Sequence, residues 1–159
     1  MIGGRTMDTS NLVVRGYVTL HVPCRFSYLR IIRQSVMDLC ARAGLSEFKA
    51  AQMEMAVDEA CANIIEHSYG GEADDEKEPR HPGIRVNLMH CADRIVVEML
   101  DRGKGFVFEQ QQVIEPQEYV ESQNQRGLGM FIIKSFVDDV SYEPGTRAGN
   151  CLRLTKMLR

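Results

Sequence analysis

Two glycines and an arginine open an apolar segment near the end of the chain, in the run Arg126-Gly127-Leu128-Gly129. The residues that follow, 128–137, are apolar almost throughout, which predicts a buried helix. The first N–H groups of a helix have no partner within the helix, and together with the helix dipole they bind anions. Glycines let a phosphate reach this backbone, and the arginine adds positive charge. A close helix–sheet contact that needs small residues explains the same glycines equally well.

A second glycine-rich turn, residues 101–106, comes directly after another apolar segment and reads Asp101-Arg102-Gly103-Lys104-Gly105-Phe106. Alternate glycines let the backbone turn sharply and approach a ligand closely. Asp101, at the end of a predicted strand, is well placed to accept a hydrogen bond from such a ligand. A plain turn after a strand is the alternative. The pattern differs from the dinucleotide-binding fingerprint, in which G-x-G-x-x-G precedes a helix.

Three polar residues, Glu59, Asn63 and His67, are spaced four apart in a segment with helical periodicity. Four residues overshoot one helical turn by only about 40°, so the three side chains form one polar stripe beside the apolar stripe. Ordinary surface residues would give the same stripe. Asparagine has a poor propensity for helix interiors, however, and this favours a specific task for Asn63.

Helices and strands that could position these residues follow from the apolar spacing. Steps of three and four predict amphipathic helices over residues 26–43 and 46–69, in addition to the helix at 128–137. Alternating or continuous apolar runs predict strands at 17–22, 84–89, 95–100, 140–142 and 152–158. Helices grouped on one face of a mixed, mainly antiparallel sheet make a two-layer α+β sandwich with three helices.

Connecting segments are predicted from their polar and turn-forming residues. A short turn at Ala92-Asp93 makes the two middle strands an antiparallel hairpin, and Pro144-Gly145 predicts a turn between the last two strands. The polar stretch 107–125 is long for a structureless connection inside a compact domain, and such loops are typically either functional lids or disordered. Residues 1–14 are expected to form an N-terminal extension, and residues 15–159 a single domain.

Composition narrows the classes of protein to consider. The chain has 159 residues, 44% of them apolar and 26% charged, which suits one globular domain with its own core. No apolar run approaches the roughly 20 residues that span a bilayer, and the N-terminus lacks the apolar core of a signal peptide. The net charge of −3, without clustered Lys and Arg, argues against direct nucleic-acid binding.

Cysteines and histidines show no metal-binding pattern. The five cysteines are spread along the chain without a C-x-x-C pair, and they are interpreted as small apolar residues in a reducing compartment. The four histidines show no pair at zinc-ligand spacing. The sequence therefore argues against a metal held by the protein alone, whereas a metal brought in by a phosphate ligand remains open.

The order of the three motifs is far more specific than any one of them. Glu59-x-x-x-Asn63, then Asp101-x-Gly103-x-Gly105, then a polar loop and Gly127-x-Gly129, resembles the ATP-binding boxes of the GHKL (histidine kinase-like) superfamily. Residues 58–69 (DEACANIIEHSY) and 126–133 (RGLGMFII) are similar to those of the bacterial anti-sigma factor serine-protein kinases. The resemblance covers nearly the whole chain, from about residue 15 to 158, and it implies the histidine kinase-like ATPase fold.

Each motif residue receives a role from this resemblance. ATP and Mg²⁺ are the implied cofactors, with Asn63 as the protein ligand of Mg²⁺ and Glu59 as the base that accepts the proton of an attacking serine. Asp101 would recognise the adenine amino group. The implied ATP-binding residues also include Gly103, Gly105, Phe106, Arg126, Gly127, Leu128 and Gly129. His67 would not contact ATP but would shape the pocket or bond to the loop that follows.

The same resemblance implies a function in transcription regulation. The expected protein is a cytoplasmic serine-protein kinase that phosphorylates an anti-anti-sigma (antagonist) protein and sequesters a sigma factor, commonly as a homodimer. An alternative is a nucleotide-gated binding module without phosphoryl transfer. A third possibility, the catalytic half of a two-component histidine kinase, needs a phospho-accepting histidine on a preceding helical hairpin. His21, the one histidine upstream, falls in a strand-like segment, which argues against it.

Overall fold

Five strands form one antiparallel sheet, which the computed structural model describes together with its helices over residues 12–106 and 128–159. Across the sheet the strands stand in the order β1 (Val14–Val22), β2 (Ile84–Cys91), β3 (Arg94–Asp101), β5 (Gly149–Met157) and β4 (Asp139–Thr146). The sequence predicts a mixed, mainly antiparallel sheet. All four pairings between the described strands are antiparallel.

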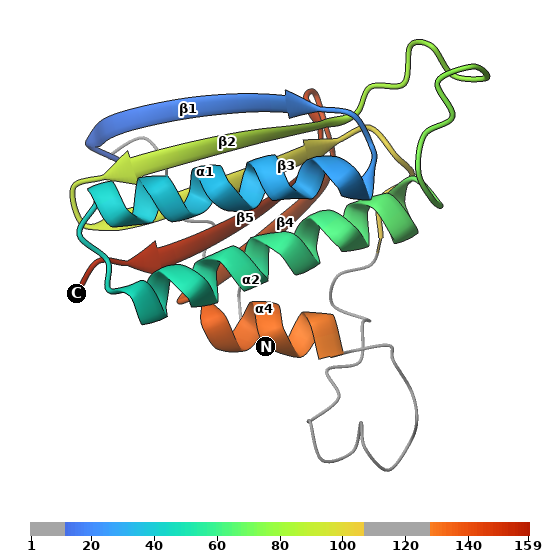
Figure 1. Ribbon diagram of the computed structural model, residues 1–159. Helices are drawn as coiled ribbons and strands as arrows, with labels where there is room; N and C mark the ends of the chain where they lie inside the picture. The colour runs from blue at the N-terminus through green and yellow to red at the C-terminus, as the bar shows by residue number, and fades with distance from the viewer. Residues whose placement is uncertain (1–11, 107–127) are drawn as a thin grey trace.

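Three helices cover one face of this sheet, so the predicted two-layer α+β sandwich is confirmed (Figure 1). They are α1 (Leu29–Arg42), preceded by a 3-10 turn η2 (Phe26–Tyr28), then α2 (Glu47–Asn63) and α4 (Leu128–Phe136). Helix α2 packs against both of the others. Its N-terminus is capped by Ser46, whose hydroxyl accepts a hydrogen bond from the Lys49 N–H at 3.3 Å.

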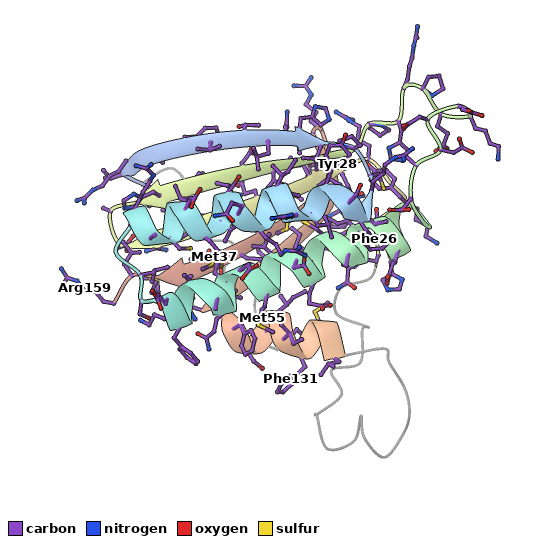
Figure 2. All side chains as sticks on the ribbon, viewed as in Figure 1. Phe26, Tyr28, Met37, Met55, Phe131 and Arg159 are labelled. Carbon is purple, nitrogen blue, oxygen red and sulfur yellow. The ribbon has the colours of Figure 1, made fainter. Side chains whose placement is uncertain are left out.

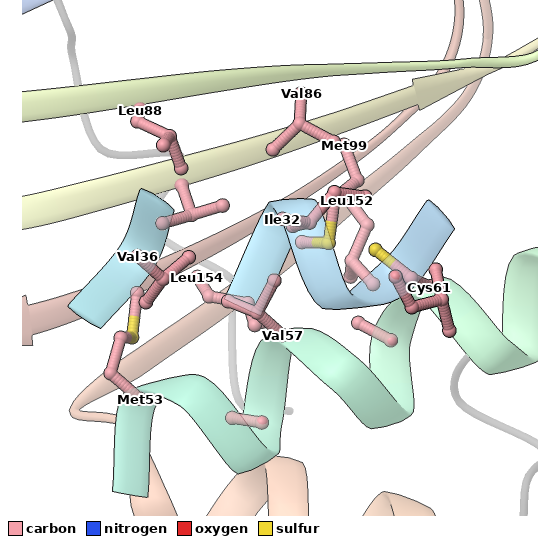
Figure 3. Packing of buried hydrophobic residues seen from close by; sticks show 14 of the residues in the cluster. Ile32, Val36, Met53, Val57, Cys61, Val86, Leu88, Met99, Leu152 and Leu154 are labelled. Atoms are coloured by element: carbon pink, nitrogen blue, oxygen red, sulfur yellow. The ribbon is translucent and has the colours of Figure 1, made fainter. Parts of the chain in front are cut away.

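The hydrophobic core lies between the helices and the sheet. Its side chains come from both layers and are shielded from water; those labelled in Figure 3 are Ile32, Val36, Met53, Val57, Cys61, Val86, Leu88, Met99, Leu152 and Leu154. Burying one large aliphatic side chain contributes about 1.5–3 kcal/mol. The core therefore fixes α2 firmly against the strands that lead to the site.

The cysteines take part in this packing as the sequence predicts. All five are free, and four of them are buried. Burial raises the pKa of the Cys24 and Cys40 thiols to about 11, and that of Cys61 to about 12. These thiols are consequently neutral apolar groups at physiological pH.

Two local expectations differ from the structure. Helix α2 ends at Asn63 and continues as a π turn, η3 (Ile64–Ser68), so the last turns before Tyr69 are wider than predicted. The expected turn at Pro144-Gly145 is wrong, because β4 runs on to Thr146 and the tight turn lies at 147–148. Gly145 has φ +64° and lets β4 absorb a bulge in its pairing with β5.

Parts of the expected domain organisation lie outside the described residues. This holds for the lid at 107–125 and for residues 1–11 of the N-terminal extension, while Val14 already belongs to β1. The predicted hairpin is present, since β2 ends at Cys91 and β3 begins at Arg94. No helix in the described parts of the chain is long and apolar enough to cross a membrane.

Candidate functional site

Asp101 is a buried carboxylate at the end of β3, with 3% of its surface exposed. Its Oδ1 accepts hydrogen bonds from the Ser68 hydroxyl, from the Gly103 N–H at 2.9 Å and from Asn150 Nδ2 at 3.0 Å. Its Oδ2 accepts no hydrogen bond from the described residues. Three donors hold the buried charge in place and leave one oxygen for a ligand.

The glycines after Asp101 are required by the protein's own contacts. A Cβ on Gly103 would overlap with the carbonyl oxygen of Ser68, and Gly105 has φ +73° with Tyr142 Oη 2.8 Å from where its Cβ would be. The Gly105 N–H donates to Ser68 Oγ at 3.0 Å, and the Lys104 N–H donates to Ser68 O at 2.9 Å. Their lack of a Cβ admits Ser68 and Tyr142, and the ligand approach that the sequence predicts for these glycines stays a prediction.

Phe106, which follows this turn, is held by β4. Its ring stacks on Tyr142 with centroids 4.8 Å apart and planes 11° apart, and its N–H donates to Tyr142 Oη at 3.2 Å. Burial raises the pKa of Tyr142 above its ordinary value. The chain therefore enters residues 107–127 from an anchored position.

Glu59 lies on α2 against the first turn of α4. A Cβ on Gly129 would overlap with Glu59 Oε2, so the carboxylate reaches the α4 backbone. Burial raises the pKa of the Glu59 carboxyl, and the nearby charges of Asp58 and Glu66 raise it further. A carboxylate with a raised pKa is a better proton acceptor near neutral pH.

The remaining predicted residues are placed as follows. Asn63 is the half-buried last residue of α2, and its side chain forms no hydrogen bond with the described residues. Leu128 opens α4, whereas Arg126 and Gly127 lie outside the described residues. His67 is exposed, with Nε2 4.0 Å from Glu66 Oε2, so the supporting role predicted for it remains a prediction.

The structure thus assembles two groups of residues connected by one continuous helical segment. Asp101, Gly103, Gly105 and Phe106 gather around Ser68, while Glu59 and Gly129 meet where α2 faces α4. Ser68 ends the π turn that continues α2, which joins the two groups. Ser68 lies nine positions after Glu59, which corresponds to about 13 Å along an α-helix axis.

Three residues of this arrangement were missed by the sequence reasoning: Ser68, Tyr142 and Asn150. Asn150 also donates to Gly103 O at 3.1 Å and is 5% exposed. One signal was present, because Asn150 shares the inward strand face of Leu152 and Leu154, where a polar side chain needs a partner. Nothing in the local pattern of Ser68 or Tyr142 distinguishes them.

Comparison with known proteins identifies the family of the chain. Residues 22–156 match the family described as Histidine kinase-like ATPase domain. The chain belongs to this family. Relatives of the chain include serine-protein kinase RsbW of Bacillus subtilis, 27% identical over 146 residues that cover 89% of this chain and 86% of the relative. RsbW of Listeria monocytogenes serotype 4a is 32% identical over 134 residues, covering 80% and 81%.

A solved structure shows the same fold. It contains the RsbU and RsbW domains of a Mycobacterium tuberculosis protein, with a TM-score of 0.60 and 16% identity. The match covers 89% of this chain and 32% of that longer chain. The sequence relatives place the chain with the serine-protein kinases of the histidine kinase-like ATPase family, as the motif order predicts.

Among the described residues, the donor groups of this family member fit a magnesium ion that is shared with a nucleotide. No group of three or more His, Cys, Asp or Glu that could hold a metal occurs among residues 12–106 and 128–159. Asn63 offers one uncommitted amide oxygen on α2. Mg²⁺ prefers oxygen ligands and commonly shares its shell with phosphates and water, so a single protein ligand is chemically adequate.

Proposed function

We propose that the chain is an ATP-dependent serine-protein kinase that also acts as an anti-sigma factor. It phosphorylates a serine of an anti-anti-sigma protein and sequesters a sigma factor. The contact between Glu59 and the first turn of α4 carries the proposal, because it puts a proton acceptor beside an anion-binding helix start. The names of the relatives support the serine as acceptor.

The adenine end of the nucleotide is assigned to the residues after β3. Asp101 Oδ2, its open oxygen, accepts a hydrogen bond from the adenine 6-amino group. Gly103, Gly105 and Phe106 line the base and sugar. The adenine acceptor keeps its orientation because Ser68 and Asn150 hold the other carboxylate oxygen.

The phosphate end is assigned to α2 and the start of α4. Backbone N–H groups of Gly127, Leu128 and Gly129 bind the phosphates, and Arg126 adds a positive charge. The amide oxygen of Asn63 would hold Mg²⁺, which supplies charge neutralisation when bound. Residues 107–125 form the lid in this assignment.

Transfer then needs one proton acceptor. The serine oxygen of the antagonist forms a bond to the γ-phosphorus while the bond from that phosphorus to the ADP oxygen breaks. Glu59 takes the serine proton. Phosphoryl transfer depends mainly on positioning and charge neutralisation, and a nearby base completes the requirements.

The partners proposed are an antagonist protein and a sigma factor, with neither direct nucleic-acid contact nor membrane attachment. The protein acts in the cytoplasm, where sigma factors work. A homodimer is proposed on the family resemblance, and exposed apolar side chains on β1 (Val14, Tyr17 and Val18) offer a surface for it.

The test is phosphoryl transfer from labelled ATP to a purified antagonist, with ATP binding measured in parallel. Glu59→Gln should lower the transfer rate by about 100-fold or more, while the Kd for ATP changes little. Glu54→Gln is the matched control, because Glu54 lies on the same helix but pairs with Arg33 at 3.8 Å.

Two outcomes would contradict the proposal. Transfer at the normal rate by Glu59→Gln would remove Glu59 as the base. A wild-type chain that binds ATP and regulates its partner without labelling it would instead establish the nucleotide-gated binding module.

A further inference from the structure

The interface between α2 and α4 has a polar contact near each end. At one end Glu59 reaches Gly129, and at the other Lys156 Nζ donates to Phe136 O at 2.6 Å and to Gln52 Oε1 at 3.1 Å. On each helix the two contacting residues are seven apart, which is two turns. The helices therefore run antiparallel, and both ends of their register are fixed.

The backbone conformation of Gly129 does not require a glycine. Its φ is not among the positive values, so an L side chain could adopt its conformation. The three atoms nearest to a Cβ at this position are Oε2, Cδ at 3.4 Å and Cγ at 3.9 Å, all from Glu59. The space that glycine leaves empty is thus taken up by one carboxylate.

The direction of the Phe131 side chain shows which side of α4 Gly129 occupies. Phe131, two residues further along, points away from α2 (Figure 2), and residues two apart on a helix lie on nearly opposite faces. Gly129 accordingly faces α2 directly. Buried Lys156, 7% exposed, holds the far end of α4 and prevents the helix from sliding away from Glu59.

We propose that Gly129 is a positioning residue, because its lack of a side chain leaves the space that the Glu59 carboxylate occupies. The inference rests on the proposed kinase function and deepens it, because it separates the tasks of the two glycines in Gly127-x-Gly129. Alanine would keep the backbone N–H that Gly129 offers to the phosphates, so the need for glycine at this position comes from the base. A methyl group there displaces the carboxylate, whose flexible side chain can turn away without moving either helix.

Gly129→Ala tests the proposal through the difference between transfer and binding. The kcat for antagonist phosphorylation should fall by about 100-fold, the range expected for a misplaced general base. The Kd for ATP, measured by calorimetry, should stay within about threefold. Gly16→Ala is the matched control, since a Cβ on Gly16 would lie 3.7 Å from His90 Cβ, an ordinary contact, and should change neither quantity.

A double-mutant cycle shows whether Gly129 acts through Glu59. In the Glu59→Gln background, Gly129→Ala should cause no further loss of kcat. A further loss of about 100-fold in that background would overturn the proposal. So would a rise in the ATP Kd that matches the loss of kcat, because the missing side chain would then serve phosphate binding and not the base.

A second readout needs no enzymatic activity, so it separates failure of this inference from failure of the kinase function. Alanine favours helix over glycine, so Gly129→Ala should raise the thermal midpoint by a few degrees where the space is open, as in a Glu59→Ala background. The rise should be smaller in the wild-type background. Equal shifts in the two backgrounds would contradict the contact.

Discussion

Ser68 holds the turn after β3 with both its hydroxyl and its backbone carbonyl group. The hydroxyl oxygen accepts from the Gly105 N–H, so its own proton is directed to Asp101, and the carbonyl oxygen accepts from the Lys104 N–H. With 3% of its surface exposed, Ser68 has little water to replace these partners. One hydroxyl thus orients the carboxylate assigned to adenine.

Ser68→Ala should weaken folding and nucleotide binding together. Asp101 loses one donor and the Gly105 N–H loses its acceptor, which should lower the free energy of unfolding by about 1–3 kcal/mol. Urea unfolding measures this loss, and calorimetry with ATP should show a several-fold weaker Kd. Ser35→Ala, at a half-buried serine whose hydroxyl donates to Ile31 O in its own helix, should change stability by less than about 0.5 kcal/mol. Equal effects from both substitutions would refute the role of Ser68.

At the scale of elements, the end of α2 decides how the two groups of site residues meet. The Tyr69 N–H donates to Ile64 O at 3.0 Å, five residues back, which marks the π turn. Such turns often occur at functional sites. Here the turn buries Ile64, Ile65 and Ser68 together and brings Ser68 to the loop after β3.

Lys156→Met should loosen α4 from α2. The substitution keeps a long apolar side chain but leaves Phe136 O and Gln52 Oε1 without their donor, at a cost of about 1–3 kcal/mol in the free energy of unfolding. Urea unfolding at neutral pH measures it. Lys77→Met is the control, because Lys77 is 83% exposed in its ion pair with Asp74 and should matter little. An unchanged midpoint for Lys156→Met would mean that this contact does not fix α4.

Local patterns predicted most elements but not their contacts. The hairpin of β2 and β3 follows from alternation and a short turn, and α2 follows from its apolar spacing and the Ser46 cap. Asn150 could not be assigned, because its contact with Asp101 depends on β5 pairing with β3, about 50 residues earlier. Pro144-Gly145 was misread because a bulge and a turn use the same residues.

For the molecule as a whole, the thiols with raised pKa values make the stability of the fold decrease at alkaline pH. Burial raises the pKa of Cys61 from 9.0 to about 12, with a smaller contribution from Asp58, and it raises the pKa of Cys151 to about 11. Above pH 9 the unfolded chain releases thiol protons that the folded chain retains. Stability is therefore fully present below about pH 9 and is lost as the pH rises towards the folded pKa values.

Urea unfolding between pH 8 and 10.5 should show this loss. Each such thiol should lower the free energy of unfolding by up to about 1.4 kcal/mol for every pH unit above its unfolded pKa. Cys61→Ala should lower the overall stability through lost packing and should also make the alkaline slope shallower. The slope is the informative quantity. Identical slopes for the two proteins would contradict the assignment to Cys61.

Calorimetric titration of the purified chain with ATP and GTP, in the presence of Mg²⁺, tests most directly that these elements form one nucleotide site. ATP should bind, and GTP should bind at least about tenfold more weakly, because guanine presents an oxygen where Asp101 Oδ2 requires a donor. Asp101→Asn should weaken ATP binding by a similar factor. Equal affinity for both nucleotides, or no heat from ATP, would contradict the account.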